Sequence, residues 1–176
     1  AADTKVYDGS VLSTGVPTVI SGSLVGSDSL AFTQTFNTPA VGIGNKVLTA
    51  AGFVNDGNGG NNYTVSFTTN TGTISPRPIT VTANAQSKVV GDPDPAFTFT
   101  YTGFIPPDTA AVVDTQPSCQ ISVPHNNVGT FPIVCSGGVD NNYAFSYTPG
   151  TLTVTSRALT VTPDNKTKLY GDLFTT

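Results

Sequence analysis

Residues 61–92 read NNYTVSFTTNTGTISPRPITVTANAQSKVVGD, and residues 141–172 read NNYAFSYTPGTLTVTSRALTVTPDNKTKLYGD. The two stretches align without a gap at an offset of 80 residues. A looser copy of their last motif, Lys5-Val-Tyr-Asp-Gly9, lies near the beginning of the chain. Self-similarity at a fixed period is typical of repeat proteins, in which each repeat folds as one unit. The chain is therefore expected to consist of tandem modules.

The repeat also predicts where the modules begin and end. A first module is expected at residues 1–75, a second at 76–156, and the truncated start of a third at 157–176. The joints between them are very short, and the first contains Pro76 and Pro78. Short linkers that contain proline restrict how far neighbouring modules can swing. The sequence therefore predicts a stiff, extended rod.

Within each module the apolar side chains recur at every second residue. Tyr and Phe alternate with Thr, Ser or Ala over 97–102 and 143–148, and residues 63–67 follow the same pattern. A period of two indicates half-buried strands. All 11 acidic residues are Asp, and the chain has no Met or Trp, so strong helix formers are few. We expect an all-β fold of tandem Ig-like β-sandwich modules. The alternative is a β-grasp-like sheet with a short helix near 108–113, capped by Asp108.

The charge pattern narrows the possible partners. Charged residues make up 10% of the chain, the net charge is -4, and Lys and Arg form no cluster. Such a chain has no basic surface to neutralise phosphates, so nucleic acid is not expected as a partner. No apolar run reaches the roughly 18 residues that a membrane-spanning helix needs. No membrane span is therefore expected in this stretch.

The two cysteines fit a hairpin between residues 119–123 and 131–135. One register places three pairs opposite one another: Cys119 with Cys135, Ile121 with Ile133, and Val123 with Phe131. Alternate strand residues share a face, so this register predicts a disulfide. Two free, buried thiols are the alternative. A zinc site is disfavoured, because Zn²⁺ takes four ligands and the chain has one histidine.

These motifs together resemble the YDG and MBG (YGX-type) repeat modules of large bacterial surface adhesins, including filamentous-haemagglutinin-like proteins. The first module has the YDG signature at Val6-Tyr-Asp-Gly9. The second has the MBG pattern, with Lys88-Val-Val-Gly-Asp92 and Asn142-Tyr143 among its motifs. Val90 replaces the usual Tyr of the YGD motif, which Tyr170 restores in the third copy. The resemblance implies secretion, repetition and adhesion, and it brings no catalytic residues.

Three other clusters contain polar groups that could bind a metal ion or take part in catalysis. The loop at 56–62 offers oxygen ligands for Ca²⁺, but a turn is favoured because it has a single carboxylate. Residues 92–95, Asp-Pro-Asp-Pro, are expected to form a turn whose carboxylates accept backbone N–H bonds. His125 is expected to be solvated in the hairpin loop. Most Asp residues adjoin turn residues, and no nucleophile elbow is present. We therefore expect no enzymatic activity and no cofactor.

Three functions remain. The first is a structural or adhesive stalk in an extracellular protein of the bacterial cell surface or biofilm, whose partners are the neighbouring modules of a long chain. The second is a carbohydrate- or protein-binding module that contacts a host glycan or surface protein through its loops. The third is a self-associating filament subunit that uses residues 157–176, in which Ala158–Thr162 is a strand without a partner.

Overall fold

The computed structural model describes residues 2–171, and its architecture is all-β, as the alternation predicts. The strands are β1 (Thr4–Val6), β2 (Ser29–Phe36), β3 (Gly42–Asn55), β4 (Asn70–Ser75), β5 (Arg77–Ala83), β6 (Gln86–Val89), β7 (Phe99–Thr102), β8 (Ser118–Gln120), β9 (Gly129–Ser136), β10 (Tyr143–Thr148) and β11 (Gly150–Thr155). No helix in this range is long and apolar enough to cross a membrane.

Strands β1 to β4 form one sheet, which we call the N-terminal unit. Its strand order is β1-β4-β3-β2, with β1 parallel to β4 and the other pairs antiparallel. Its buried core cluster consists of Phe36, Leu48 and Ile74, against which Tyr7 and Val41 pack. This core is small, because a single curled sheet has only one face to bury.

Strands β5 to β11 form the C-terminal unit, which has two sheets. One has the order β10-β5-β7 and the other β6-β11-β9-β8. The pairs β5–β10 and β6–β11 are parallel. Both sheets contribute to one buried cluster, consisting of Val81, Ala83, Ile133, Cys135, Leu152 and Val154. The unit is thus a two-layered sandwich in which alternate residues of β5, β9 and β11 form the core.

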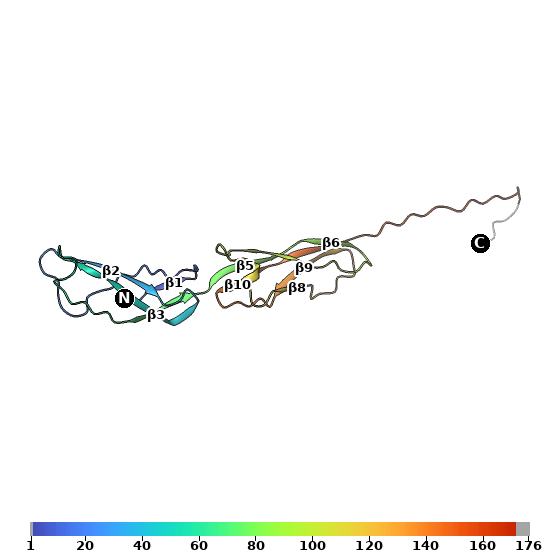
Figure 1. The fold of residues 1–176 in the computed structure, drawn as a ribbon. Coiled ribbons are helices and arrows are strands. Elements are labelled where there is room, and N and C mark those ends of the chain that lie inside the picture. The colour runs from blue at the N-terminus through green and yellow to red at the C-terminus, as the bar shows by residue number, and fades with distance from the viewer. Residues whose placement is uncertain (1, 172–176) are drawn as a thin grey trace.

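The two units lie end to end, and the last described residues extend away from the C-terminal unit (Figure 1). Only Pro76 separates β4 from β5. Residues 157–171, which we call the tail, belong to no strand of the described chain. Asp172, the last residue of the third YGD motif, lies outside the described residues, as do 173–176.

The helix suggested near 108–113 is a single 3₁₀ turn, η1 (Ala110–Val112). Its N-cap is Thr109, whose hydroxyl accepts the Ala111 N–H at 3.4 Å. The prediction that Asp108 caps this segment is therefore wrong. Asp108 instead lies at the joint between the units, where the hydroxyls of Tyr7 and Tyr143 donate to its carboxylate.

The sequence repeat reappears as repeated geometry. β1 runs parallel to β4, and the Tyr7 N–H then donates to the Ser75 carbonyl at 2.9 Å. β6 runs parallel to β11 in the same way, and the Val90 N–H donates to the Thr155 carbonyl at 2.8 Å. Val90 therefore occupies in the C-terminal unit the position that Tyr7 occupies in the N-terminal unit.

Candidate functional site

The disulfide lies on the sheet edge of the C-terminal unit. Cys119 of β8 and Cys135 of β9 are directly opposite in an antiparallel ladder and are bonded to each other. This is the pairing that the sequence register predicts, and Cys135 lies in the core cluster. Neither cysteine is free for chemistry. The bond ties the short β8 strand to the body of the unit.

The joint between the two units is built around one carboxylate, that of Asp108. The Tyr143 hydroxyl donates to it at 2.7 Å from within the same unit, and the Tyr7 hydroxyl reaches it at 3.4 Å from the N-terminal unit. The two tyrosine rings meet edge to face with centroids 5.4 Å apart. Burial, followed by the hydrogen bond to Asp108, raises the pKa of Tyr143 to about 12, so its hydroxyl remains a donor. Burial and Asp108 also raise the pKa of Tyr7.

The Asn-Asn-Tyr motif supplies a second set of contacts at the joint. The Asn142 carbonyl accepts the Arg77 N–H at 2.9 Å, and its side-chain oxygen accepts the Val41 N–H of the other unit at 3.1 Å. The Asp140 carboxylate fixes this turn by accepting the Asn142 and Tyr143 N–H groups at 2.7 and 2.9 Å. One asparagine therefore fastens β5, the turn and the N-terminal unit together.

The glycine of the YDG signature also belongs to the joint. Gly9 has a φ of 74°, in the left-handed region that favours glycine. A Cβ atom at this position would lie 3.1 Å from the Cδ1 atom of Ile105 in the C-terminal unit. The signature therefore combines a turn that needs glycine with a close approach between units.

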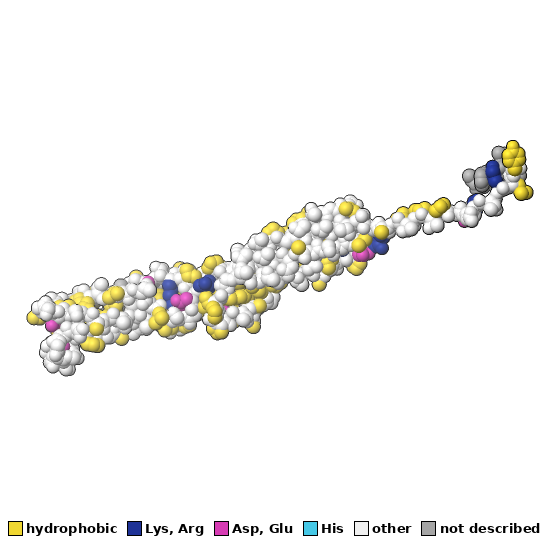
Figure 2. All heavy atoms as spheres, turned by 90° about the horizontal axis from the view of Figure 1, so that it is seen from above, with side chains coloured by type: hydrophobic (Ala, Val, Ile, Leu, Met, Phe, Trp, Pro, Cys, Tyr) yellow, Lys and Arg dark blue, Asp and Glu magenta, His cyan; other side chains and the backbone are white. Residues whose placement is uncertain are grey.

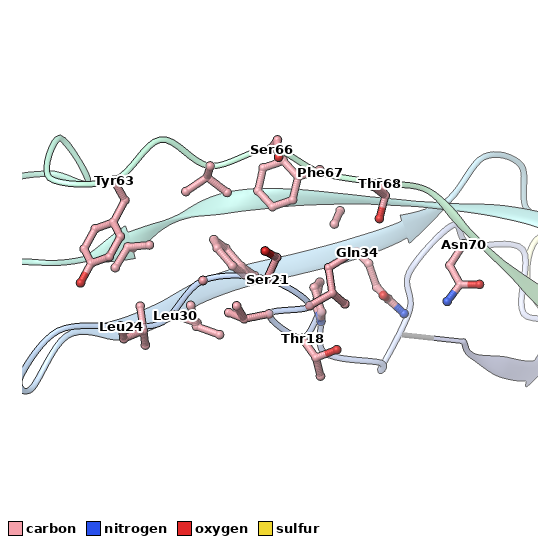
Figure 3. A pocket seen from close by; sticks show the side chains of 18 of the residues that line it. Thr18, Ser21, Leu24, Leu30, Gln34, Tyr63, Ser66, Phe67, Thr68 and Asn70 are labelled. Atoms are coloured by element: carbon pink, nitrogen blue, oxygen red, sulfur yellow. The ribbon is translucent and has the colours of Figure 1, made fainter.

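A groove with a volume of about 430 Å³ lies in the N-terminal unit (Figure 3). Residues 17–24 line one side and residues 63–70 the other, while β2 and β3 form the floor. We call it the N-terminal groove. Val65 and Phe67 on one side, and Ile20 on the other, are exposed. The sequence alternation predicts a half-buried strand at 63–67, but the backbone there belongs to no strand.

Tyr63 closes one end of this groove. Its hydroxyl donates to the Asp28 carboxylate at 2.6 Å and accepts the Val25 N–H at 2.8 Å. The hydrogen bond to Asp28 raises the pKa of Tyr63. The polar contacts hold residues 25–28 against Tyr63, so this end of the groove is fixed.

The loop at 56–62 is a turn organised by Asp56. Its carboxylate accepts the N–H groups of Asn58, Gly60 and Asn62 at 2.8, 2.7 and 2.9 Å. These bonds lower the pKa of Asp56, because they favour the charged form. The single carboxylate is thus occupied by its own loop. Within residues 2–171, no three His, Cys, Asp or Glu side chains gather in a group that could hold a metal ion.

The predictions for residues 92–95 and for His125 are both wrong in detail. The Asp94 carboxylate accepts the Lys88 ammonium at 2.6 Å and the His125 Nε2 at 2.8 Å. The Asp92 carboxylate accepts from Arg157. His125 is half-buried: its Nδ1 contacts the Val123 carbonyl at 2.9 Å, and its ring lies near Phe131. The two carboxylates therefore have side-chain partners in place of the expected backbone N–H bonds, and the His125 ring contacts protein acceptors in place of solvent.

The pKa values in this cluster follow from its hydrogen bonds. The Val123 carbonyl and the Asp94 carboxylate both raise the pKa of His125. Lys88 and His125 lower the pKa of Asp94. A ring that meets an acceptor at each nitrogen is best satisfied when both nitrogens carry a proton. The cluster is a Lys–Asp–His ion pair that joins the residues after β6 to the β8–β9 connection.

Comparison with known protein families finds a match for each of the two units. No curated protein and no solved structure matches this chain. Residues 1–72 match the family model of the YDG domain, and residues 79–153 match that of the MBG domain (YGX type). The first range covers the strands of the N-terminal unit up to β4, and the second covers most of the C-terminal unit. The chain therefore carries a YDG domain followed by an MBG domain of the YGX type.

Proposed function

We propose that the chain is a non-catalytic stalk segment of a secreted bacterial surface adhesin, which holds a distal binding region away from the cell. The observation that supports this best is the joint: Tyr7, Asp108, Tyr143 and Asn142 connect the units on both sides of Pro76. Several contacts across a linker of one residue favour a fixed orientation. A fixed orientation is what a spacer requires.

Two further features support the proposal. The disulfide between Cys119 and Cys135 suits an oxidising, extracellular setting. The carboxylates at the joint and in the loops are engaged by backbone N–H groups, tyrosine hydroxyls and Lys or Arg, so they stabilise turns and contacts. Asp56 and Asp94 are poor general acids or bases, because their hydrogen bonds lower their pKa values rather than raise them toward neutrality.

The test is a distance distribution between the two units. Spin labels are attached through unnatural residues at the exposed positions Ser27 and Asn127, so that the disulfide stays intact. A stalk gives one narrow distribution in dilute solution. A broad distribution, typical of freely hinged units, would overturn the proposal.

A further inference from the structure

Two long segments of the C-terminal unit run side by side from one end of it to the other. The first segment consists of β5 and β6, which are separated only by residues 84–85, and the second consists of β10 and β11, which are separated only by Pro149. β5 pairs with β10 in one sheet and β6 pairs with β11 in the other, and both pairings are parallel. We call the two segments together the parallel pair.

A single register holds over the whole length of the parallel pair. Arg77 lies opposite Tyr143 at its beginning. Val89 lies opposite Thr155 at its end, and in both cases the two residues are 66 positions apart. Six residue pairs belong to the first sheet and four to the second. The parallel pair therefore passes from one sheet to the other without a shift of register.

Hydrogen bonds outside the two ladders extend this contact at both ends. At the joint, the Arg77 N–H donates to the Asn142 carbonyl at 2.9 Å. At the far end, the Val90 N–H donates to the Thr155 carbonyl at 2.8 Å. The Nε–H of Arg157 then donates to the Val90 carbonyl at 3.3 Å. The contact between the two segments therefore reaches from the joint to the first residue of the tail.

Side-chain hydroxyls add to the backbone contact along the parallel pair. The Ser146 hydroxyl donates to the Ile79 carbonyl at 3.0 Å and contacts the Thr80 hydroxyl at 3.0 Å. The Thr155 hydroxyl donates to the Lys88 carbonyl at 3.2 Å. The two segments are therefore joined by hydroxyl groups in both sheets as well as by the ladders.

Both segments are also anchored in the core. On the first segment, Ile79 and Val81 are 1% and 0% exposed. On the second, Leu152 and Val154 are 0% and 1% exposed. Sliding one segment past the other would pull these side chains out of a close-packed interior and expose apolar surface. The core therefore resists the same movement as the hydrogen bonds.

The chain enters and leaves the C-terminal unit at opposite ends of the parallel pair. It enters through Pro76, which precedes β5 at the joint, and leaves through Ser156, which follows β11 at the far end (Figure 1). The space-filling view shows the unit elongated between these two ends, with the narrow tail leaving from the far one (Figure 2). Tension along the chain therefore pulls the first segment toward the joint and the second toward the tail, which is shear along the strands.

We propose that the parallel pair is a load-bearing clamp, which keeps the C-terminal unit folded when the chain is pulled from both sides. Under shear the hydrogen bonds of both sheets carry the load together, so many of them must break before either segment moves. Under a load applied at one end of the pair, the same bonds open one at a time. The inference rests on the proposed stalk, since a stalk that holds a binding region transmits tension.

Single-molecule pulling on the whole chain in two directions tests the clamp. Handles attached through unnatural residues at the exposed positions Ser27 and Asn165 load the parallel pair in shear. Moving the first handle to the exposed Pro93, which follows β6, loads the same bonds from the far end alone. We expect the C-terminal unit to open at a clearly higher force in shear. Equal forces in the two directions would overturn the proposal.

The disulfide identifies which unfolding events belong to the C-terminal unit. Cys119 and Cys135 are 16 positions apart, so the loop that they close shortens the released length by about 50 Å. Reduction of the disulfide restores that length. Events from the N-terminal unit do not change on reduction, because that unit has no cysteine. Each force can therefore be assigned to its unit.

Substitutions test whether the contacts between the two segments carry the load. Ser146→Ala/Thr155→Val removes the hydroxyl contacts of the parallel pair, so we expect the lifetime of the unit under constant shear force to shorten about tenfold. The matched control, Thr115→Val/Ser118→Ala, makes the same chemical changes at exposed positions outside the pair and should leave the lifetime unchanged. A control that shortens the lifetime as much as the test variant would count against the clamp.

The clamp and the stalk can fail separately. The opening force depends on contacts within the C-terminal unit, whereas the label distance between Ser27 and Asn127 depends on the joint between the units. A narrow distance distribution with equal forces in the two pulling directions rejects the clamp alone. A broad distribution with a higher force in shear rejects the stalk alone.

Discussion

Tyr7 and Tyr143 share one acceptor, the Asp108 carboxylate, although Tyr7 belongs to the N-terminal unit and Tyr143 to the C-terminal unit. Their rings also meet edge to face, an arrangement that adds about 0.5–1.5 kcal/mol beyond buried area. The tyrosine of the YDG signature and the tyrosine of the Asn-Asn-Tyr motif therefore form a single contact between the two units. The joint depends on both.

Asp108→Ala should loosen this joint. It leaves the Tyr143 hydroxyl, which is buried, without its acceptor, so we expect the C-terminal unit to lose roughly 1–3 kcal/mol of stability. The distance distribution between labels at Ser27 and Asn127 should broaden. The control is Asp114→Ala, which removes the same charge from an exposed side chain that contacts Asn141. Equal effects of the two substitutions would show that charge, not the shared acceptor, matters.

Removing the disulfide should destabilise the C-terminal unit alone. Cys119→Ser/Cys135→Ser opens a loop closed across 16 positions, which should lower the free energy of unfolding by about 3 kcal/mol. The N-terminal unit has no cysteine, so its unfolding transition should not move. Separate tyrosine or NMR signals from each unit follow the two transitions during denaturation. A parallel loss in both units would show that they unfold as one.

Whether a contact can be predicted from the sequence alone depends on how many residues separate its two partners along the chain. Strands and the Cys119–Cys135 pairing follow from alternation and register, which are local. The bond from Tyr7 to Asp108 spans 101 residues, and no local pattern indicates it. The signal that could have found it is the repeat, because Asp28 and Asp108 share the 80-residue offset of Tyr63 and Tyr143.

The sequence does not predict the N-terminal groove, for a related reason. The alternation at 63–67 predicts a paired strand, since the pattern reports the side chains and not whether a neighbour is present. The same limit explains His125, whose partner Asp94 lies 31 positions away. Composition predicts a loop there, but only the fold brings the Asp94 carboxylate to Nε2 of the ring.

Stability should depend on pH through His125. Its pKa is raised in the folded state by the Val123 carbonyl and by Asp94, while the unfolded value is about 6.5. The stabilisation is therefore complete below that pH and is lost as the pH rises through the raised folded pKa. Asp94 has a lowered pKa, so its contribution is lost only as the pH falls through that value.

Thermal unfolding of the wild type and of His125→Gln, followed from about pH 5 to about pH 8, measures this contribution. Gln can still donate to Asp94 but does not titrate. We expect the melting temperature of the wild type to exceed that of His125→Gln at acidic pH, and the gap to narrow as the pH rises. Curves that stay parallel over the whole range would remove His125 as the titrating group.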